Sequence, residues 1–172
     1  PTKPNQIWEM DMTKTYLNGY GWLYIMAIID RYDRSIVGYE INSRSRATEW
    51  LAAFDKAVKN RFPEGTRDQG LILQADNGCQ PTSRKFVKEL STCDVALLYS
   101  AYATPEHNAH IERFFRTLKE EEIYYNLYET YSEAITSIEA YIDFYNNNRI
   151  HSALGYLTPA EYYQQSILQN VA

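Results

Sequence analysis

The sequence is poor in the residues and runs that mark several large classes of protein. Its 172 residues include only two cysteines, seven glycines and six prolines, which argues against a disulfide framework and against a collagen-like or low-complexity chain. It contains no run of about 18 apolar residues of the kind that spans a membrane. Residues 1–6 lack the pattern of a signal peptide. We therefore expect a cytoplasmic globular protein that makes no contact with a membrane.

An excess of basic residues is also lacking. Seventeen lysines and arginines stand against 22 acidic residues, which gives a net charge of −5. Proteins that neutralise phosphates usually carry a positive excess, so the net charge alone argues against a nucleic-acid partner. The distribution of charge weakens that argument, because residues 123–172 carry one arginine and five acidic side chains. The acidic excess is therefore mainly a property of the tail, which we expect to face protein or solvent.

The first third of the chain has the pattern of three strands. Residues 7–13 alternate, with one face formed by Ile7, Glu9, Asp11 and Thr13. A nearly continuous apolar run at 22–29 indicates a strand buried on both faces, and a third strand follows at 36–41. Polar, turn-forming segments at 18–21 and 30–35 separate the three. We predict a three-stranded antiparallel meander.

The remainder alternates between helical and strand patterns. We expect short apolar strands at 71–76 and 95–99, and helices at 47–58, 83–90, 106–121 and 132–147. The order β-β-β-α-β-α-β-α-α predicts an α/β protein with a mixed sheet of five strands flanked by helices. We interpret residues 1–172 as one domain, in which about 5–122 form the sheet and its helices and about 123–172 a helical C-terminal part. Ligands of such sheets gather outside the carboxyl ends of the strands.

Three carboxylates stand where a globular chain has little structural need of them. Asp11 lies in the middle of a strand, a position where aspartate is depleted. Asp76 ends a strand, and Glu112 lies on a helix after a separation of 35 residues. Carboxylate oxygens are the ligands that Mg²⁺ prefers, and two such ions can bind the attacking and leaving oxygens of a displacement at phosphorus. Each residue alone also fits an ordinary role, as a turn former, a solvated helix carboxylate or a strand-edge charge.

Taken together, the motifs resemble those of one known family. The matching segments, in order, are residues 4–13, 23–38, 76–80, 108–119 and 145–159, which are similar to N-x-x-W-x-x-D-x-T, D-x-x-S-R-x-I-V-G, D-x-G-x-Q, N-A-x-x-E-x-F-F-x-T-L-K and Y-N-x-x-R-x-H-x-x-L-x-x-x-T-P. These motifs belong to the catalytic core of the DDE transposases and retroviral-type integrases. The resemblance is greatest to the bacterial insertion-sequence transposases of the IS3 type. It covers roughly residues 5 to 163.

The resemblance implies an RNase H-like fold and a D,D-35-E triad of Asp11, Asp76 and Glu112 that binds two Mg²⁺ or Mn²⁺ ions. It implies a polynucleotidyl transferase, in which water cuts a DNA end and the freed 3′-hydroxyl attacks a target strand. Two alternatives remain open at this point. One is a structure-specific nuclease of the RNase H type without strand transfer, and the other is a catalytically silent core that only binds DNA or oligomerises.

The resemblance also implies DNA as a partner, held near the triad by Lys119, Arg116 and Asn108. Glu112, Arg116 and Lys119 are spaced to share one helix face, although Arg116 and Lys119 could instead pair with helix carboxylates. Asn108 could equally cap the helix. We expect a homo-oligomer in the active complex, nucleoid association when it acts, and a domain for recognising DNA ends that is missing from this chain.

Three departures from the family pattern are visible in the sequence. Gln74 and Ala75 stand where the family often has His-Ser, Pro81 stands where an aromatic residue is common, and Asp33 replaces a serine in the hairpin motif. No departure removes a member of the triad. Asp30 is the nearest rival to the three carboxylates, although we interpret both Asp30 and Asp33 as turn formers.

Overall fold

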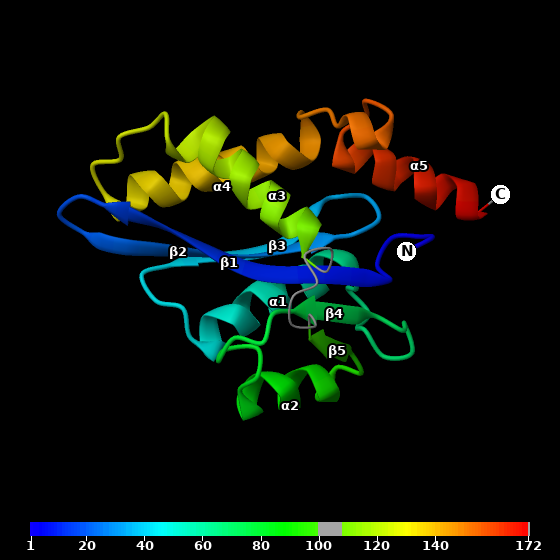
Figure 1. The fold of residues 1–172 in the computed structure, drawn as a ribbon. Helices are drawn as coiled ribbons and strands as arrows, with labels where there is room; N and C mark the ends of the chain where they lie inside the picture. Colours follow the sequence, from blue (N-terminus) through cyan, green and yellow to red (C-terminus); the bar gives the residue numbers. More distant parts are fainter. Residues whose placement is uncertain (100–107, 172) are drawn as a thin grey trace.

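A five-stranded sheet lies between two layers of helices in the computed structural model, which describes residues 1–99 and 108–171 (Figure 1). The strands are β1 (Ile7–Leu17), β2 (Gly21–Asp30), β3 (Ile36–Asn42), β4 (Ile72–Ala75) and β5 (Ala96–Tyr99). Their order across the sheet is β3-β2-β1-β4-β5. The first three are antiparallel neighbours, and β4 and β5 continue the sheet in parallel with β1. The predicted mixed sheet of five strands is therefore confirmed.

Helices cover both faces of this sheet (Figure 1). They are α1 (Ala47–Arg61), α2 (Arg84–Thr92), α3 (Ala109–Leu118), α4 (Tyr131–Asn147) and α5 (Pro159–Val171), with a π-helical turn η2 (Lys119–Ile123) and a short 3-10 turn η3 (Ser152–Leu154). The pairs α1–α2 and α3–α4 pack on opposite faces. Each face of the sheet thus has its own hydrophobic core.

Two expected boundaries differ from the structure. The helix predicted for 106–121 runs from Ala109 to Leu118 and then widens into the π-helical turn, while residues 106 and 107 lie outside the described part of the chain. Helix α5 was not predicted as a separate element. It begins with a reciprocal pair of hydrogen bonds, in which the Thr158 amide donates to Glu161 Oε2 (2.9 Å) and the Glu161 amide donates to Thr158 Oγ1 (3.2 Å). This capping box is a start signal that the sequence does carry.

The alternation of β1 divides its side chains between the two cores. Trp8 and Met10 are fully buried in the core that α1 and α2 cover. Asp11 lies opposite Ala27 of β2, whose side chain belongs to the core beneath α3 and α4. Because successive side chains of a strand point to opposite faces, Glu9 and Asp11 face the layer that contains α3. The predicted assignment of faces along this strand is confirmed.

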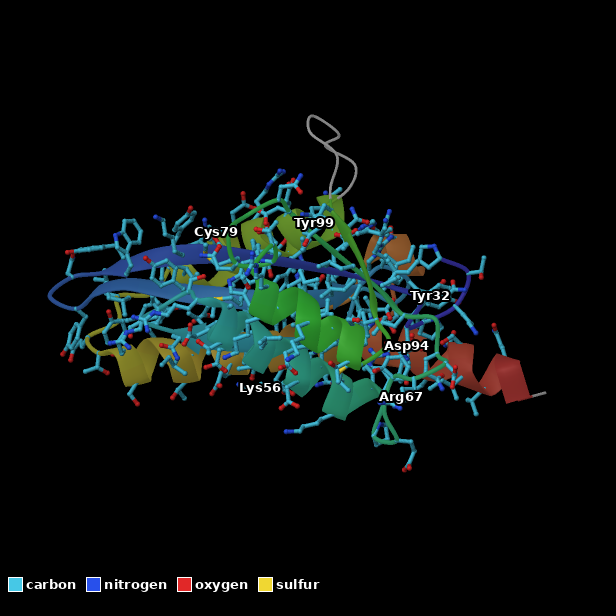
Figure 2. The ribbon with its side chains drawn as sticks, turned by 90° about the horizontal axis from the view of Figure 1, so that it is seen from below. Tyr32, Lys56, Arg67, Cys79, Asp94 and Tyr99 are labelled. Carbon is cyan, nitrogen blue, oxygen red and sulfur yellow. The ribbon has the colours of Figure 1, made fainter. Side chains whose placement is uncertain are left out.

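The parallel strands bring their carboxyl ends to one edge of the molecule. Cys79, just after β4, and Tyr99, the last residue of β5, lie on one side, whereas Arg67 and Asp94, which precede these strands, lie on the other (Figure 2). The Tyr99 hydroxyl donates to the Pro81 carbonyl over 3.2 Å, so the segment after β4 is held against the end of β5. Among the described residues, no helix is both long enough and apolar enough to cross a membrane.

Candidate active site

Strand pairing brings Asp11 and Asp76 next to each other. Strands β1 and β4 run in parallel, and the last paired residues of their ladder are Met10 and Ala75. Asp11 is the next residue of β1, and Asp76 directly follows β4, so both lie at the carboxyl end of β4. Two carboxylates 65 positions apart in the sequence therefore occupy neighbouring places at the edge where such sheets bind ligands.

A tight turn holds the Asp76 side chain. Its Oδ1 accepts a hydrogen bond from the Gly78 amide over 2.9 Å. A Cβ atom at position 78 would lie only 2.8 Å from that same oxygen, so any larger residue there would displace the Asp76 carboxylate. The Asp76 side chain is exposed and remains accessible to a ligand through its other oxygen.

Helix α3 supplies the third carboxylate from the face of the sheet to which Asp11 points. Its residues Ile111, Phe114, Phe115 and Leu118 are buried in the core between α3, α4 and β2. Glu112 lies in the first turn and is exposed. The amphipathic pattern of this helix thus buries one side against the sheet and leaves Glu112 on the open side, near the carboxyl ends of the strands.

The electrostatics of Asp11 show that the three carboxylates share one neighbourhood. The pKa of Asp11 is raised to about 6, mainly by burial, against the opposing hydrogen bond from the Met12 amide and with added repulsion from the negative charges of Asp76 and Glu112. That amide donates to Asp11 Oδ1 over 2.7 Å. A carboxylate that faces two others is destabilised by their repulsion, and a bound cation would relieve it.

The donor set has the chemistry of a divalent-cation site, because all three groups offer hard oxygen ligands. Within the described residues, however, no three histidine, cysteine or acidic side chains stand close enough together to hold a single ion.

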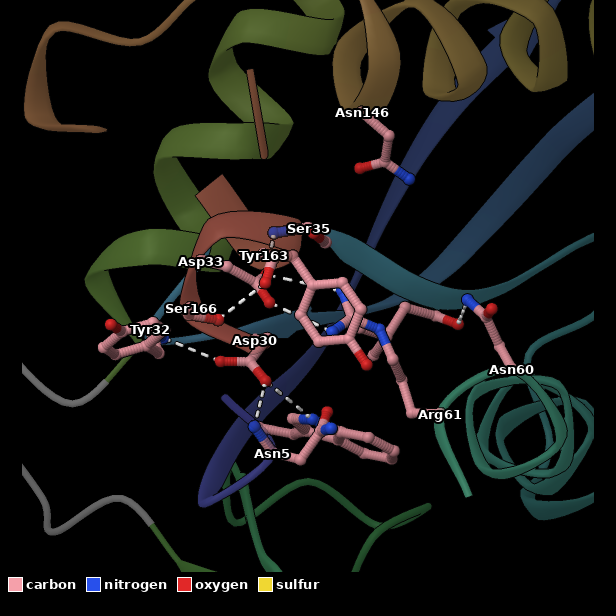
Figure 3. Close-up of polar contacts among 12 residues, drawn as sticks. Asn5, Asp30, Tyr32, Asp33, Ser35, Asn60, Arg61, Asn146, Tyr163 and Ser166 are labelled. Atoms are coloured by element: carbon pink, nitrogen blue, oxygen red, sulfur yellow. Dashed lines mark hydrogen bonds and ion pairs between the residues drawn. The ribbon is translucent and has the colours of Figure 1, made fainter. Parts of the chain in front are cut away.

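Asp30, the rival carboxylate, has a structural role. It is fully buried, and its oxygens accept hydrogen bonds from the Asn5 amide (2.6 Å), the Trp8 indole (3.2 Å) and the Tyr32 amide (2.7 Å) (Figure 3). Burial and the neighbouring Asp33 charge raise the pKa of Asp30 to about 6. This residue fixes the N-terminal segment and the turn after β2, so the prediction that it forms a turn is confirmed.

Asp33 forms the second buried link at this turn. It accepts a hydrogen bond from the Ser35 amide over 2.8 Å and pairs with Arg61 over 3.0 Å (Figure 3). Both side chains of the ion pair are buried. The aspartate in the hairpin motif therefore ties the turn to the end of α1.

The predicted DNA contacts lie along α3 and its extension. Arg116 is exposed near the end of the helix, and Lys119 is the first residue of the π-helical turn. Asn108 precedes the helix and is buried, but its side chain does not cap the helix, and its Oδ1 atom has no hydrogen-bond partner in the described structure. Capping by Asn108, one of the two roles considered for it, is therefore not observed.

A cavity of about 630 Å³ lies on another flank of α3. Its walls include Arg34, Arg113 and Arg149, together with Tyr145 and His151. The three carboxylates are not among the residues that line it. The candidate site is therefore separate from this cavity.

Sequence reasoning missed the residues that support the site. Glu9 is fully buried and contacts Arg31 and His110, and Arg31 in turn contacts Gln74. One signal was available, because the strand alternation places Glu9 on the face of Asp11. The partners on β4 and α3 are remote in sequence, and no local pattern reveals them.

Comparison with known proteins identifies the family. A family model described as an integrase core domain matches residues 1–105, and a second model with the same description matches residues 94–159. The chain belongs to the integrase core domain family. The resemblance inferred from the motifs is thereby confirmed.

Bacterial transposases are among the relatives of this integrase core. The chain is 35% identical over 163 residues to the transposase for insertion sequence element IS904 of Lactococcus lactis, covering 94% of the chain and 62% of that protein. It is 30% identical over 170 residues to the putative transposase InsK for element IS150 of Escherichia coli, covering 99% of the chain and 58% of that protein. The chain thus spans about 60% of the length of these relatives.

Comparison with solved structures identifies the fold. The catalytic core domain of HTLV-2 integrase, in a structure with magnesium, matches with a TM-score of 0.71 at 16% identity, over 94% of this chain and 97% of that one. The catalytic domain of the Mos1 mariner transposase matches with a TM-score of 0.68 at 14% identity, over 93% of this chain and 74% of that one. The RNase H-like fold predicted from the sequence is confirmed.

Proposed function

We propose that this chain is the catalytic core of a transposase that cuts DNA ends and joins them to a target strand. The observation that carries the proposal is the juxtaposition of Asp11, within β1, and Asp76, directly after the paired strand β4, with Glu112 near enough for its charge to raise the pKa of Asp11. The names of the bacterial relatives support the same activity.

Asp11, Asp76 and Glu112 would hold two Mg²⁺ or Mn²⁺ ions. Ions bound there would lower the pKa of the attacking hydroxyl and offset the charge that develops on phosphorus. The magnesium in the structure of the HTLV-2 core supports this choice of metal.

Two successive displacements at phosphorus account for cutting and joining. Water forms a new bond to phosphorus and the bond to the 3′ oxygen breaks, which leaves a 3′-hydroxyl. That hydroxyl then loses its proton, attacks a phosphodiester of the target, and displaces another 3′ oxygen, which takes up a proton and leaves as a 3′-hydroxyl. Arg116 and Lys119 would bind backbone phosphates beside the three carboxylates, and Asn108 would orient a metal ligand or a phosphate.

The proposal assigns recognition of DNA ends to a domain outside these residues and the active form to a homo-oligomer. The acidic tail, whose one arginine, Arg149, already pairs with Glu121 over 2.6 Å, would not contribute phosphate contacts.

Joining of a pre-cut duplex to a supercoiled plasmid tests this function. With Mn²⁺ present, we expect the chain to form joined products and Glu112→Gln to fall to the level seen without added metal. Glu120→Gln is the matched control, because Glu120 is an exposed glutamate in the following π-helical turn, and it should retain activity. Hydrolysis without joined products would instead indicate a nuclease of the RNase H type, and metal-independent DNA binding alone would indicate a silent core.

A further inference from the structure

The residues two positions before the three proposed ligands are joined to one another in the structure. They are Glu9 on β1, Gln74 on β4 and His110 on α3, which precede Asp11, Asp76 and Glu112 respectively. None of them was singled out as part of the site by its motif. Their contacts connect the three elements that carry the carboxylates.

Glu9 caps the helix that carries Glu112. Its Oε2 atom accepts hydrogen bonds from the backbone amides of His110 (3.1 Å) and Ile111 (3.0 Å). The first amides of a helix have no partner within the helix, and a negative charge near them is stabilising. A strand residue remote in sequence therefore provides the cap that the Asn108 side chain does not.

The second oxygen of Glu9 extends the network. Oε1 lies 2.7 Å from His110 Nδ1 and 3.1 Å from Arg31 Nε. Arg31 Nη1 donates to Gln74 Oε1 over 3.3 Å. The Glu9 side chain is fully buried, and a buried charge is stable only when it is paired and hydrogen-bonded. These contacts hold β1, β4 and the start of α3 in one arrangement.

We propose that Glu9, with Arg31, His110 and Gln74, is a positioning residue that sets the spacing of the metal-binding carboxylates. The inference rests on the proposed function. Alternate residues of a strand share a face, so Glu9 is anchored on the same face as Asp11. On α3, the capped amides lie within two residues of Glu112, so movement of the helix start would move Glu112. Mg²⁺ demands near-ideal ligand geometry, so a small displacement weakens its binding.

Binding of Mn²⁺ to the whole chain, measured by calorimetric titration, tests the inference without DNA. Glu9→Gln keeps an acceptor for the two amides but loses the charge that pairs with Arg31, and we expect its Kd to rise about 10-fold, as is typical of residues that orient ligands. Asp33→Asn is the matched control. It breaks another fully buried carboxylate pair, with Arg61, and should lower the urea midpoint while the Kd for Mn²⁺ stays unchanged.

A pair of substitutions at His110 separates positioning from general damage. Asn can present a donor near the place of Nδ1, so His110→Asn should bind Mn²⁺ more tightly than His110→Leu. Equal affinities for wild type, Glu9→Gln and Asp33→Asn would overturn the inference and leave the proposed function standing. An equal loss of affinity in Glu9→Gln and Asp33→Asn would also overturn it. Mn²⁺ binding that Asp11→Asn does not weaken would overturn the metal site itself.

Discussion

Two aspartates show how surroundings assign a role to a residue. Burial raises the pKa of both Asp11 and Asp30 to about 6. Asp30 accepts hydrogen bonds from an indole and two backbone amides, whereas Asp11 faces two further carboxylates. The hydrogen bonds to Asp30 stabilise a carboxylate with a structural role. The carboxylates around Asp11 repel it, which favours binding of a cation there. The residue type was readable from the sequence, but these partners were not.

His151 gives a pH-dependent prediction. Its ring packs edge-on against Tyr145, with the ring centroids 4.8 Å apart. Burial, and to a smaller extent the positive charge of Arg149, lowers the pKa of His151 to about 4. In the unfolded chain this histidine binds a proton below about pH 6.5, whereas in the native protein the histidine stays neutral down to about pH 4. Its contribution to stability is therefore lost progressively as the pH falls between these values.

We expect the urea midpoint of the wild type to fall more steeply between pH 7 and pH 4.5 than that of His151→Phe, which keeps a ring but cannot titrate. Equilibrium unfolding at several pH values measures both slopes. Parallel slopes would show that the histidine titrates alike in the native and unfolded states.

At the scale of the element, periodicity predicted the strands and the first four helices, because apolar spacing reports which face is buried. It did not predict the π-helical turn after Leu118 or the start of α3, where the cap comes from a different strand. Helix α5 was missed although Thr158 and Glu161 form a capping box, since a motif of four residues is a weak signal without its tertiary setting.

That capping box gives a prediction about α5. Thr158→Ala removes the hydroxyl that accepts a hydrogen bond from the Glu161 amide, and we expect the free energy of unfolding to fall by about 1 kcal/mol. Thr136→Ala, at an exposed position inside α4, is the control and should be neutral or slightly stabilising because alanine favours helix. Urea denaturation compares the two. Equal effects would mean that the cap contributes nothing specific to α5.

At the scale of the whole molecule, Arg61 joins three distant parts of the chain. It ends α1, pairs with Asp33 in the turn between β2 and β3, and lies 3.7 Å from the ring centroid of Tyr163 on α5 (Figure 3). A planar guanidinium can make the ion pair and the ring contact together, whereas an ammonium group cannot do so with the same geometry.

Arg61→Lys should therefore lower the free energy of unfolding by about 2 kcal/mol, less than the full cost of leaving Asp33 buried without a partner. Lys59→Met is the control, because its ion pair with Asp55 is exposed, and it should change stability by less than about 0.5 kcal/mol. A double-mutant cycle that combines Arg61→Lys with Tyr163→Leu, measured by urea denaturation, should show a coupling free energy of about 0.5–1 kcal/mol between the two residues. Strict additivity would show that the ring contact is not stabilising.

The sequence by itself determined the order of the strands and of the first four helices, the faces of the first strand, and the three carboxylates proposed as ligands. These follow from local periodicity and from residue types at fixed spacing. Only the tertiary structure decided that Asp30 is structural, that Asn108 does not cap α3, and that Glu9 does. Each of these depends on contacts between segments far apart in the chain, and burial and pairing there set the energy of a charge.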